Sequence, residues 1–165
     1  MEINYRIAYE NIINLEKEGL IKINKAGNSK LSGLTYKFDN SLFEAEYLRS
    51  KELFNNKNLL VIHNSLSELK FPFIALLFGS YAKKTSNKNS DIDILTIGGN
   101  EKEIQRTLSL YPDKIHLTSI SYEDFISMAK SKEFSIVSEA IKNNIILIGI
   151  EEYYRLLKNV RYKQN

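Results

Sequence analysis

The feature that most constrains this chain is a pair of apolar segments separated by a glycine-serine turn and a polar loop. Residues 73–78 are apolar almost throughout and run directly into Gly79-Ser80. Ten residues later, a second apolar segment opens with Asp91-Ile92-Asp93. Short apolar runs bounded by turn residues predict two buried strands, with the turn and the aspartates at their ends.

The two aspartates are expected to act together. Side chains alternate between the faces of a strand, so Asp91 and Asp93 should point the same way while Ile92 and Ile94 point into the opposite layer. Two carboxylates on one face provide the hard oxygen ligands that Mg²⁺ prefers. This pattern therefore predicts a metal-binding edge on the second strand.

The turn supplies the complementary half of a candidate site. Gly79 allows the backbone to turn sharply and lets a ligand approach closely, and Ser80 offers a hydroxyl and an amide. A short helix is expected at residues 81–84, and helix starts attract phosphate. Either element alone is common in proteins, but anion donors opposite a metal site indicate phosphoryl or nucleotidyl transfer.

Gly79-Ser80, ten intervening residues and Asp91-Ile92-Asp93 resemble the signature of the DNA polymerase beta type nucleotidyltransferase superfamily, in particular its small, minimal members. The resemblance covers roughly residues 58–158. It implies that Gly79 and Ser80 bind the triphosphate of an NTP substrate and that Asp91 and Asp93 bind Mg²⁺ or Mn²⁺ ions. Two further nucleotide-binding residues are assigned on the same loop, Lys83 and Ser90.

Two departures from that pattern leave the activity open. The loop reads Ala82-Lys83-Lys84, where such proteins commonly have a glycine after the basic residue. Polymerase-like members also take a third carboxylate from a later strand, whereas residues 114–120 contain no acid. His116 occupies about that position, either as a third metal ligand or as a partly exposed strand histidine.

The N-terminal part predicts a helix followed by a hairpin. Ala8, Ile12 and Leu15 repeat at helical spacing up to Gly19, and alternating runs at residues 20–23 and 34–38 predict two strands with a long, basic tip. This arrangement resembles the recognition helix and wing of a winged helix-turn-helix domain, although the two preceding helices are missing. Residues 5–37 would then contact DNA, or instead form a packing or homo-oligomer surface.

Composition narrows the remaining classes of function. The chain has 165 residues, a net charge of +3, two histidines and no cysteine, which excludes disulfides, thiolate metal sites and a cysteine nucleophile. No apolar run reaches the length of a membrane span, and the N-terminus carries charges instead of a signal-peptide core. We therefore expect a cytoplasmic protein without membrane contact.

Strand and helix patterns interleave along the rest of the chain. Ser41 and Glu44 predict a capping box that opens a helix at residues 42–55, and the asparagine-rich residues 55–58 predict a boundary between domains 1–57 and 58–165. The class is α/β or α+β, with a small mixed sheet and flanking helices. Further helices are expected at 59–69, 101–110, 122–131, 134–143 and 151–158, and strands at 114–120 and 145–148. Ser121 with Asp124 predicts the cap of the helix at 122–131.

The favoured hypothesis is a Mg²⁺-dependent nucleotidyltransferase that moves an NMP group, AMP from ATP in the first instance, to an acceptor. The resemblance implies acceptors of several kinds, because similar proteins act as antitoxins that modify a HEPN-type ribonuclease, or modify small molecules or RNA ends. A protein acceptor fits so small a chain best. The alternative is a catalytically inactive regulator or DNA-binding protein that keeps the fold.

Overall fold

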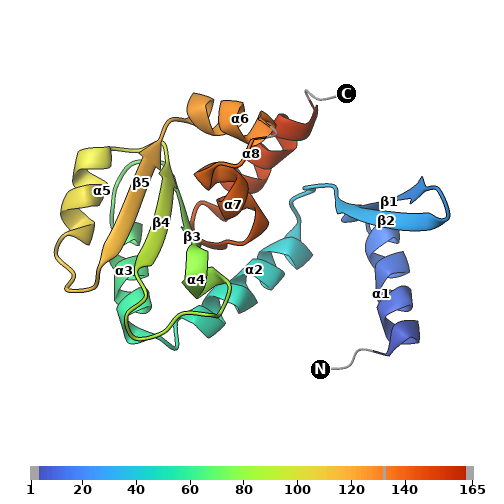
Figure 1. Cartoon of the computed structure of the whole chain (residues 1–165), viewed down its shortest axis with the longest axis horizontal. Helices are drawn as coiled ribbons and strands as arrows, with labels where there is room; N and C mark the ends of the chain where they lie inside the picture. Colours follow the sequence, from blue (N-terminus) through green and yellow to red (C-terminus); the bar gives the residue numbers. More distant parts are fainter. Residues whose placement is uncertain (1–3, 132, 163–165) are drawn as a thin grey trace.

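The main body is built on one four-stranded mixed sheet. The computed structural model describes residues 4–131 and 133–162. Strand order is β5-β4-β3-β6, with β3 antiparallel to both β4 and β6 and β4 parallel to β5 (Figure 1). This arrangement confirms the predicted class of a small mixed sheet with flanking helices. The strands are β3 (Ile74–Phe78), β4 (Ile92–Ile97), β5 (Ile115–Ile120) and β6 (Ile145–Ile148).

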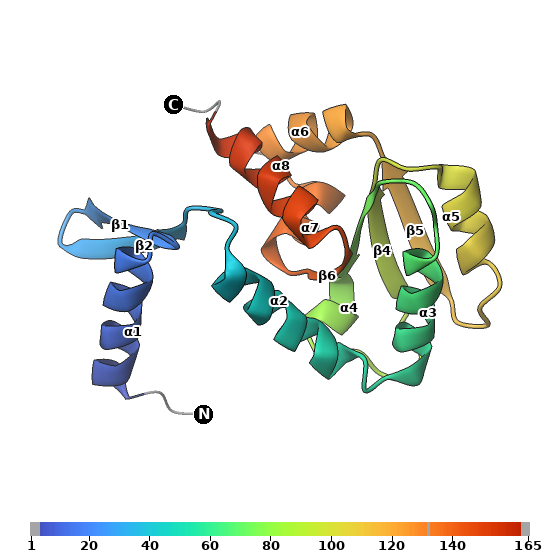
Figure 2. The ribbon, with the colours of Figure 1, turned by 180° about the vertical axis from the view of Figure 1, so that it is seen from behind.

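Helices cover both faces of this sheet. On one face, α3 (Lys57–Ser67) and α5 (Glu101–Leu108) bury their apolar stripes against one set of strand residues. On the other face lie α6 (Tyr122–Lys130), α7 (Ile136–Lys142) and α8 (Ile150–Tyr162), as the reverse view shows (Figure 2). Each central strand therefore buries side chains on both sides, which explains its continuous apolar sequence.

The alternation along β4 follows the prediction. Ile92 and Ile94 pack into the layer of α3 and α5, whereas Leu95 and Ile97 belong to the layer of α6, α7 and α8. Asp93 shares the second of these faces, at the end of the strand where the helices leave the sheet open. One strand thus contributes both to the core and to the candidate site.

Helix positions in the main body agree with the sequence to within two residues, except at the end of α8, which reaches Tyr162 instead of the predicted residue 158. Ser121 caps α6 by accepting a hydrogen bond from the Asp124 amide, as predicted. In contrast, α2 (Asn40–Leu53) is capped by Asp39, whose side chain accepts from the Leu42 amide, so the predicted capping box of Ser41 is wrong. Asp39 has the extended backbone that a cap requires, and Ser41 is already inside the helix.

The N-terminal segment forms α1 (Tyr5–Lys17) and a hairpin of β1 (Ile21–Ala26) and β2 (Ser29–Leu34). We call these three elements the N-terminal arm; it stands beside the main body in both ribbon views (Figures 1 and 2). The predicted second strand at 34–38 and the long basic tip are wrong, because a two-residue turn at Gly27-Asn28 joins the strands. Gly27 has φ +60°, the left-handed conformation that such turns need.

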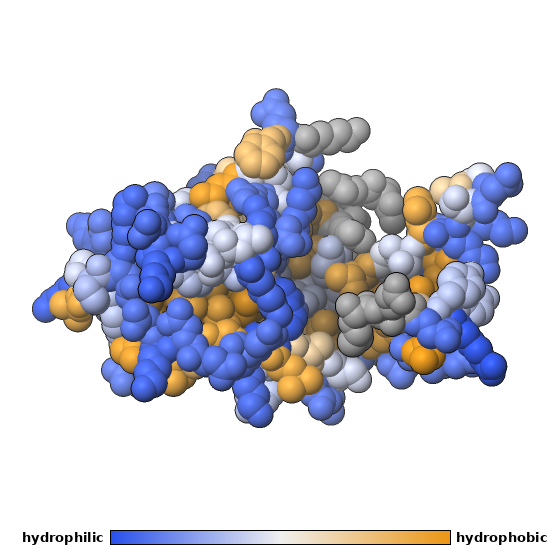
Figure 3. Space-filling view, turned by 60° about the horizontal axis from the view of Figure 1, so that its bottom comes forward, coloured by the Kyte–Doolittle hydropathy of each residue, from blue (hydrophilic) through white to orange (hydrophobic). Residues whose placement is uncertain are grey.

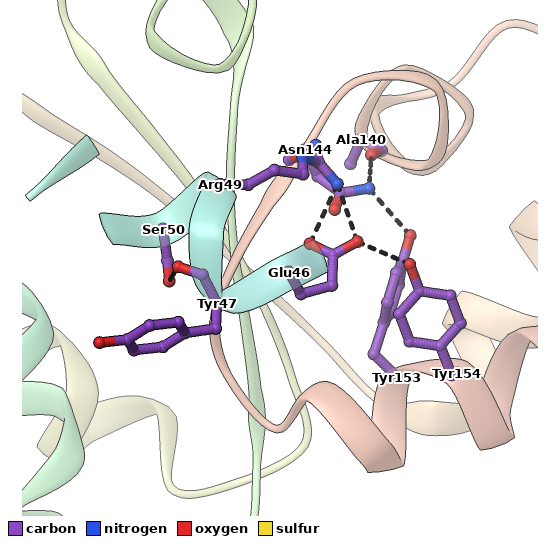
Figure 4. A network of polar contacts seen from close by, with 8 residues as sticks. All are labelled: Glu46, Tyr47, Arg49, Ser50, Ala140, Asn144, Tyr153 and Tyr154. Atoms are coloured by element: carbon purple, nitrogen blue, oxygen red, sulfur yellow. Dashed lines mark hydrogen bonds and ion pairs between the residues drawn. The ribbon is translucent and has the colours of Figure 1, made fainter. Parts of the chain in front are cut away.

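A buried polar network ties α2 to the main body (Figure 4). The Glu46 carboxylate, only 4% exposed, accepts hydrogen bonds from Arg49 at 2.8 Å and from the Tyr154 hydroxyl at 2.7 Å. Arg49 also donates to the backbone carbonyl of Asn144, whose side chain donates to the Tyr153 hydroxyl. A buried carboxylate is tolerated only when it is paired in this way, so the network holds α2 in a definite position.

Burial raises the pKa of both tyrosines in this network well above the ordinary value, and the bond to Glu46 adds to the effect at Tyr154. Both hydroxyls therefore stay protonated at every physiological pH. Tyr154 can thus donate a hydrogen bond to Glu46 throughout that pH range.

The network also bears on the predicted domain boundary. That boundary assigns α2 to residues 1–57, whereas α2 packs on the main body. The division into domains 1–57 and 58–165 stays a prediction.

Apolar side chains also reach the surface. Figure 3 looks at the molecule from below Figure 1 and shows apolar groups exposed among polar ones. On α2, Phe43, Tyr47 and Leu48 are exposed, and no residue of α1 is buried. Among the described helices, none combines the length and apolar character needed to cross a membrane.

Candidate nucleotide and metal site

Strand pairing brings the turn, the second aspartate and the histidine into one row. Phe78, the last residue of β3, pairs with Asp93 of β4, and Asp93 pairs with His116 of β5. Gly79 follows Phe78 directly and begins the short helix α4 (Gly79–Ala82), two residues earlier than predicted. Residues far apart in the chain therefore meet at one end of three adjacent strands.

The closest contact in this row is between Gly79 and Asp93. Gly79 has φ +67°, and a Cβ atom built on it would lie 2.2 Å from Asp93 Oδ2. No side chain fits in that space, and the backbone conformation itself favours glycine. The predicted need for glycine is confirmed, and its cause is the carboxylate packed against the turn.

Both aspartates lie close to His116. His116 Nε2 is 3.7 Å from Asp91 Oδ2, and His116 Nδ1 is 3.7 Å from Asp93 Oδ1. The imidazole is 58% exposed and both carboxylates are 28% exposed, so the group is accessible from solvent. His116 thus stands beside the paired carboxylates, near where a third ligand was sought.

Asp91 carries a cation that was not predicted. Lys114 Nζ lies 2.8 Å from Asp91 Oδ2, and this hydrogen bond lowers the pKa of the Asp91 carboxyl, with the charges of Lys114 and His116 adding to the effect. Asp91 is therefore ionised at neutral pH. Asp91 Oδ2 is already bound to the Lys114 ammonium group, and a metal ion that binds this oxygen would have to displace that group.

Asp93 behaves in the opposite way. Partial burial raises the pKa of its carboxyl, and the negative charges of Asp91 and Glu139 add to this, while His116 and Lys83 oppose it. Burial disfavours the ionised form of such a carboxyl. A bound cation would favour that form.

The two lysines of the turn point to different elements. Lys83 Nζ lies 2.7 Å from Glu139 Oε1 on α7, and Lys84 Nζ lies 2.7 Å from Glu52 Oε2 on α2. Lys84 has φ +58°, a conformation typical of glycine, at the position where related sequences commonly have one. Its side chain is tied to Glu52 and does not fill the turn.

The two predicted serines have mostly local partners. The Ser80 carbonyl accepts a hydrogen bond from the Thr85 amide at 2.9 Å, which closes the turn after α4. The Ser90 hydroxyl accepts from the Asn87 amide at 2.9 Å and so shapes the loop ahead of Asp91. Ser80 lies next to Gly79 in the turn, whereas Ser90 is positioned here as a loop-forming residue.

A cavity of about 810 Å³ opens beside the row. Asp93, His116 and Glu139 line it together with Phe78 and Ile136. Sequence reasoning missed Glu139, because α7 was recognised only by its apolar stripe and nothing local places that helix next to Asp93. The structure therefore adds a carboxylate to the site from an element that carries no motif.

The far part of the same cavity is lined by Asp113 and Tyr111. Asp113 Oδ1 accepts from Asn58 at 3.2 Å, whereas its buried Oδ2 has no hydrogen-bond partner among the described residues. Within residues 4–131 and 133–162, no group of three or more histidine, cysteine, aspartate or glutamate side chains is arranged to hold a metal ion. The candidate donor set is accordingly the Asp91–Asp93 pair.

A mixed sheet that holds two carboxylates against a glycine turn defines a nucleotidyltransferase-like fold. The chain belongs to the family described as polymerase beta, nucleotidyltransferase. The sequence profile of this family matches residues 61–153, which is more than half of the chain. This membership supports a nucleotidyltransferase type of function.

Two further comparisons were made with known proteins. The search of curated proteins finds no match. Among solved structures, the chain is similar to one described as "Crystal structure of the toxin-antitoxin with AMP-PNP", with 19% identity, a TM-score of 0.43, and coverage of 66% of this chain and 86% of that chain.

Proposed function

We propose that this protein is a Mg²⁺-dependent nucleotidyltransferase that transfers an NMP group, AMP from ATP in the first instance, to an acceptor. The observation that carries the proposal is the contact between the Gly79 turn and Asp93, with Asp91 on the same side. A turn that presents bare backbone beside paired carboxylates suits a triphosphate together with its metal. Family membership supports the same class of reaction.

The residues present fit a divalent cation. Asp91 and Asp93 supply carboxylate oxygens, which Mg²⁺ and Mn²⁺ both accept, and a bound cation would offset the burial that raises the pKa of Asp93. Mg²⁺ is commonly held by one or two carboxylates together with substrate phosphates, so two acids are sufficient. When bound, the metal would neutralise phosphate charge and orient the triphosphate.

The chain's own residues would then position the nucleotide. Gly79 and Ser80 would offer backbone amides and a hydroxyl to the phosphates, and Lys83 would add a positive charge. In the transfer, an acceptor oxygen loses its proton and bonds to the α-phosphorus, while the bond between that phosphorus and the leaving pyrophosphate breaks. Holding both reactants in line supplies most of the rate enhancement in such reactions.

The acceptor is proposed to be a protein, such as a HEPN-type toxin. The cavity beside Asp93 has a volume of about 810 Å³, and among the described residues its ionisable lining consists mainly of acids, Asp93, Asp113 and Glu139, with His116 beside them. Such a surface favours a neutral or basic segment that carries a hydroxyl group. A long polyanion such as RNA would be repelled there.

The N-terminal arm is proposed to contact DNA through residues 5–37 or to form a homo-oligomer. Supporting DNA contact, Lys22, Lys25 and Lys30 are exposed on the hairpin, Tyr5 and Tyr9 stack at 6.4 Å, and Lys30 Nζ lies 6.0 Å from the Tyr9 ring centroid. Supporting self-association, α1 is a 13-residue helix without a buried residue, and such short helices are marginal alone in water. The turn that joins the two strands of the hairpin, Gly27-Asn28, is shorter than the long tip that the resemblance to a wing predicted.

A second candidate function, that of a nucleotide-binding regulator without turnover, is favoured by one contact. Lys114 occupies the outer oxygen of Asp91. If this ion pair persists with nucleotide bound, only Asp93 remains for the metal, and two-carboxylate catalysis fails. Binding without transfer is the expected behaviour of such a protein.

The deciding experiment is calorimetric titration of ATP, GTP, CTP and UTP with Mg²⁺ into the wild type and into Asp91→Asn/Asp93→Asn. A control, Glu44→Gln/Glu101→Gln, removes two exposed carboxylates far from the site. Binding that is lost only in the aspartate variant supports the site, and transfer of labelled NMP to a co-purifying protein supports the enzyme. Binding that is absent from the wild type at millimolar nucleotide, or unaffected by the aspartates, contradicts it.

A further inference from the structure

Two adjacent lysines make matching ion pairs in different surroundings. Lys83 is bound to Glu139 and Lys84 to Glu52, each with a separation of 2.7 Å. Glu139 lines the cavity together with Asp93, whereas Lys84 and Glu52 line a separate cavity beside α2. One pair therefore belongs to the candidate site, and the other serves as a natural comparison for it.

Both members of the first pair are close enough to influence Asp93. The charge of Lys83 lowers the pKa of the Asp93 carboxyl, and the charge of Glu139 raises it. The Lys83 ammonium is thus near enough to Asp93 for its charge to act on that carboxyl. In the nucleotide-free protein that ammonium is neutralised by Glu139.

The position of Glu139 is set by the contacts that hold α7. Ser135 and Ser138 form a reciprocal capping box at the start of the helix, with hydrogen bonds of 3.1 and 2.9 Å. Near its end, the Asn144 side chain donates to the Ala140 carbonyl at 2.7 Å. Glu139 lies between these two contacts, so the helix backbone that carries its carboxylate is held in place.

We propose that Glu139 holds Lys83 in the nucleotide-free protein and yields it to the triphosphate, so that Glu139 is a positioning residue that sets the affinity of the site for NTP. The idea rests on the proposed function. The lysine side chain is 43% exposed and that of Glu139 30%, and ion pairs exposed to this degree are weak enough to exchange. A triphosphate carries more charge than one carboxylate and is the stronger partner.

The exchange makes an unusual prediction, because removal of a site residue should tighten binding. Glu139→Gln keeps the shape of the side chain but frees Lys83, so MgATP should bind about twofold to fivefold more tightly, the range that such ion pairs provide. Lys83→Met should weaken binding. In Lys83→Met/Glu139→Gln the gain from Glu139→Gln should disappear, because no lysine remains to be released.

The test is calorimetric titration of MgATP into the full-length wild type, both single variants and the double variant. Glu52→Gln and Lys84→Met are the matched controls, since they break the neighbouring pair outside the cavity and should leave the affinity unchanged. Thermal unfolding of each variant shows whether it retains the fold. The predicted pattern is a gain in Glu139→Gln that depends on Lys83.

Two other results would contradict the proposed exchange between Glu139 and the triphosphate. Equal or weaker binding by Glu139→Gln contradicts the exchange. The same gain in the presence and absence of Lys83 also contradicts it, because that result means general repulsion between Glu139 and the phosphates. If either result is found but wild-type binding still depends on Asp91 and Asp93, the proposed function stands and only the exchange is contradicted. If the wild-type protein binds no nucleotide, the exchange and the proposed function are both contradicted.

Discussion

Asp91 and Asp93 lie on the same side of β4, yet the pKa values of their carboxyls move in opposite directions. The hydrogen bond from Lys114 stabilises the charge on Asp91, whereas partial burial against the Gly79 turn disfavours the charge on Asp93. Two chemically identical groups, two residues apart, are thus prepared for different roles. Asp91 is hydrogen-bonded to a lysine, and Asp93 is a partly buried carboxyl.

Asp93→Asn is expected to stabilise the metal-free protein by a few tenths to about 1 kcal/mol near neutral pH, because the ionised carboxyl is disfavoured there. The folded state holds the Asp93 proton more tightly than the unfolded state, so stability falls as pH rises from the unfolded pKa through the raised folded pKa. Urea unfolding of wild type and variant between pH 3 and 8 measures this. A variant that is less stable at pH 7 and equally stable at pH 3 contradicts the prediction.

Lys114→Met is expected to raise the pKa of Asp91 and to strengthen Mg²⁺ binding about twofold to tenfold, because the metal no longer competes with the ammonium group. The pair stabilises the fold above the unfolded pKa of Asp91, and this contribution is lost as pH falls through the lowered folded pKa. Calorimetric titration with Mg²⁺ gives the affinity, and Lys102→Met on the exposed side of α5 is the control. Unchanged affinity would show that Lys114 moves aside without cost.

Gly79→Ala is expected to destabilise the protein by about 2 to 4 kcal/mol and to abolish nucleotide binding, because it combines a left-handed backbone with a clash against Asp93. Gly27→Ala is the matched control. Its φ is similar, at +60°, but no atom lies within 4 Å of the added Cβ, so about 1 kcal/mol is expected. Denaturant unfolding of both variants separates strain from clash, and equal losses would contradict the contact.

Tyr154→Phe is expected to cost about 1 to 3 kcal/mol, because it removes one of the two donors to Oε1 of the buried Glu46 and leaves only Arg49. Tyr47→Phe, on the exposed side of α2, removes the same hydroxyl from a surface position and should have almost no effect. Thermal unfolding of the two variants measures the difference. A small loss for Tyr154→Phe would mean that Arg49 alone satisfies the carboxylate.

If the arm binds DNA, replacing Lys22, Lys25 and Lys30 with glutamine should weaken binding to all duplex sequences alike. The slope of log affinity against log salt concentration should fall in magnitude by about 3, one for each lost phosphate contact. Fluorescence anisotropy at several salt concentrations gives this slope. Analytical ultracentrifugation of the same proteins tests the alternative, since a homo-oligomer formed through α1 should be broken by Ile7→Asp instead.

Local signals predicted the parts of this protein that depend on neighbours in the chain. The strand before Gly79, the alternation from Asp91 to Ile94 and the cap at Ser121 each follow from a few consecutive residues. The hairpin could have been predicted in the same way, because Gly27-Asn28 is a recognised two-residue turn signal. The prediction instead followed the apolar runs and misplaced the second strand.

Long-range packing determined what the sequence could not predict. Glu139 reaches the site because α7 packs across the sheet, and Lys114 meets Asp91 because β5 lies parallel to β4. Asp39 caps α2 instead of Ser41, although both residue types make good caps, and the choice depends on how the chain leaves the arm. The motif of Gly79-Ser80 and the two aspartates could therefore be recognised in the sequence. The charged side chains that shift the pKa values of those aspartates, Glu139 and Lys114, could not.

The network around Glu46 has a practical consequence for shortening the chain. Protein trimmed to residues 58–165 would lose Glu46 and Arg49 together. The Tyr154 hydroxyl and the Asn144 carbonyl would then face an empty groove where α2 had been. Since Asn144 also secures the helix that carries Glu139, such trimming would loosen the part of the main body that carries the candidate site. Tyr36 and Phe38 pack against the same core, so a shortened protein should begin no later than Tyr36.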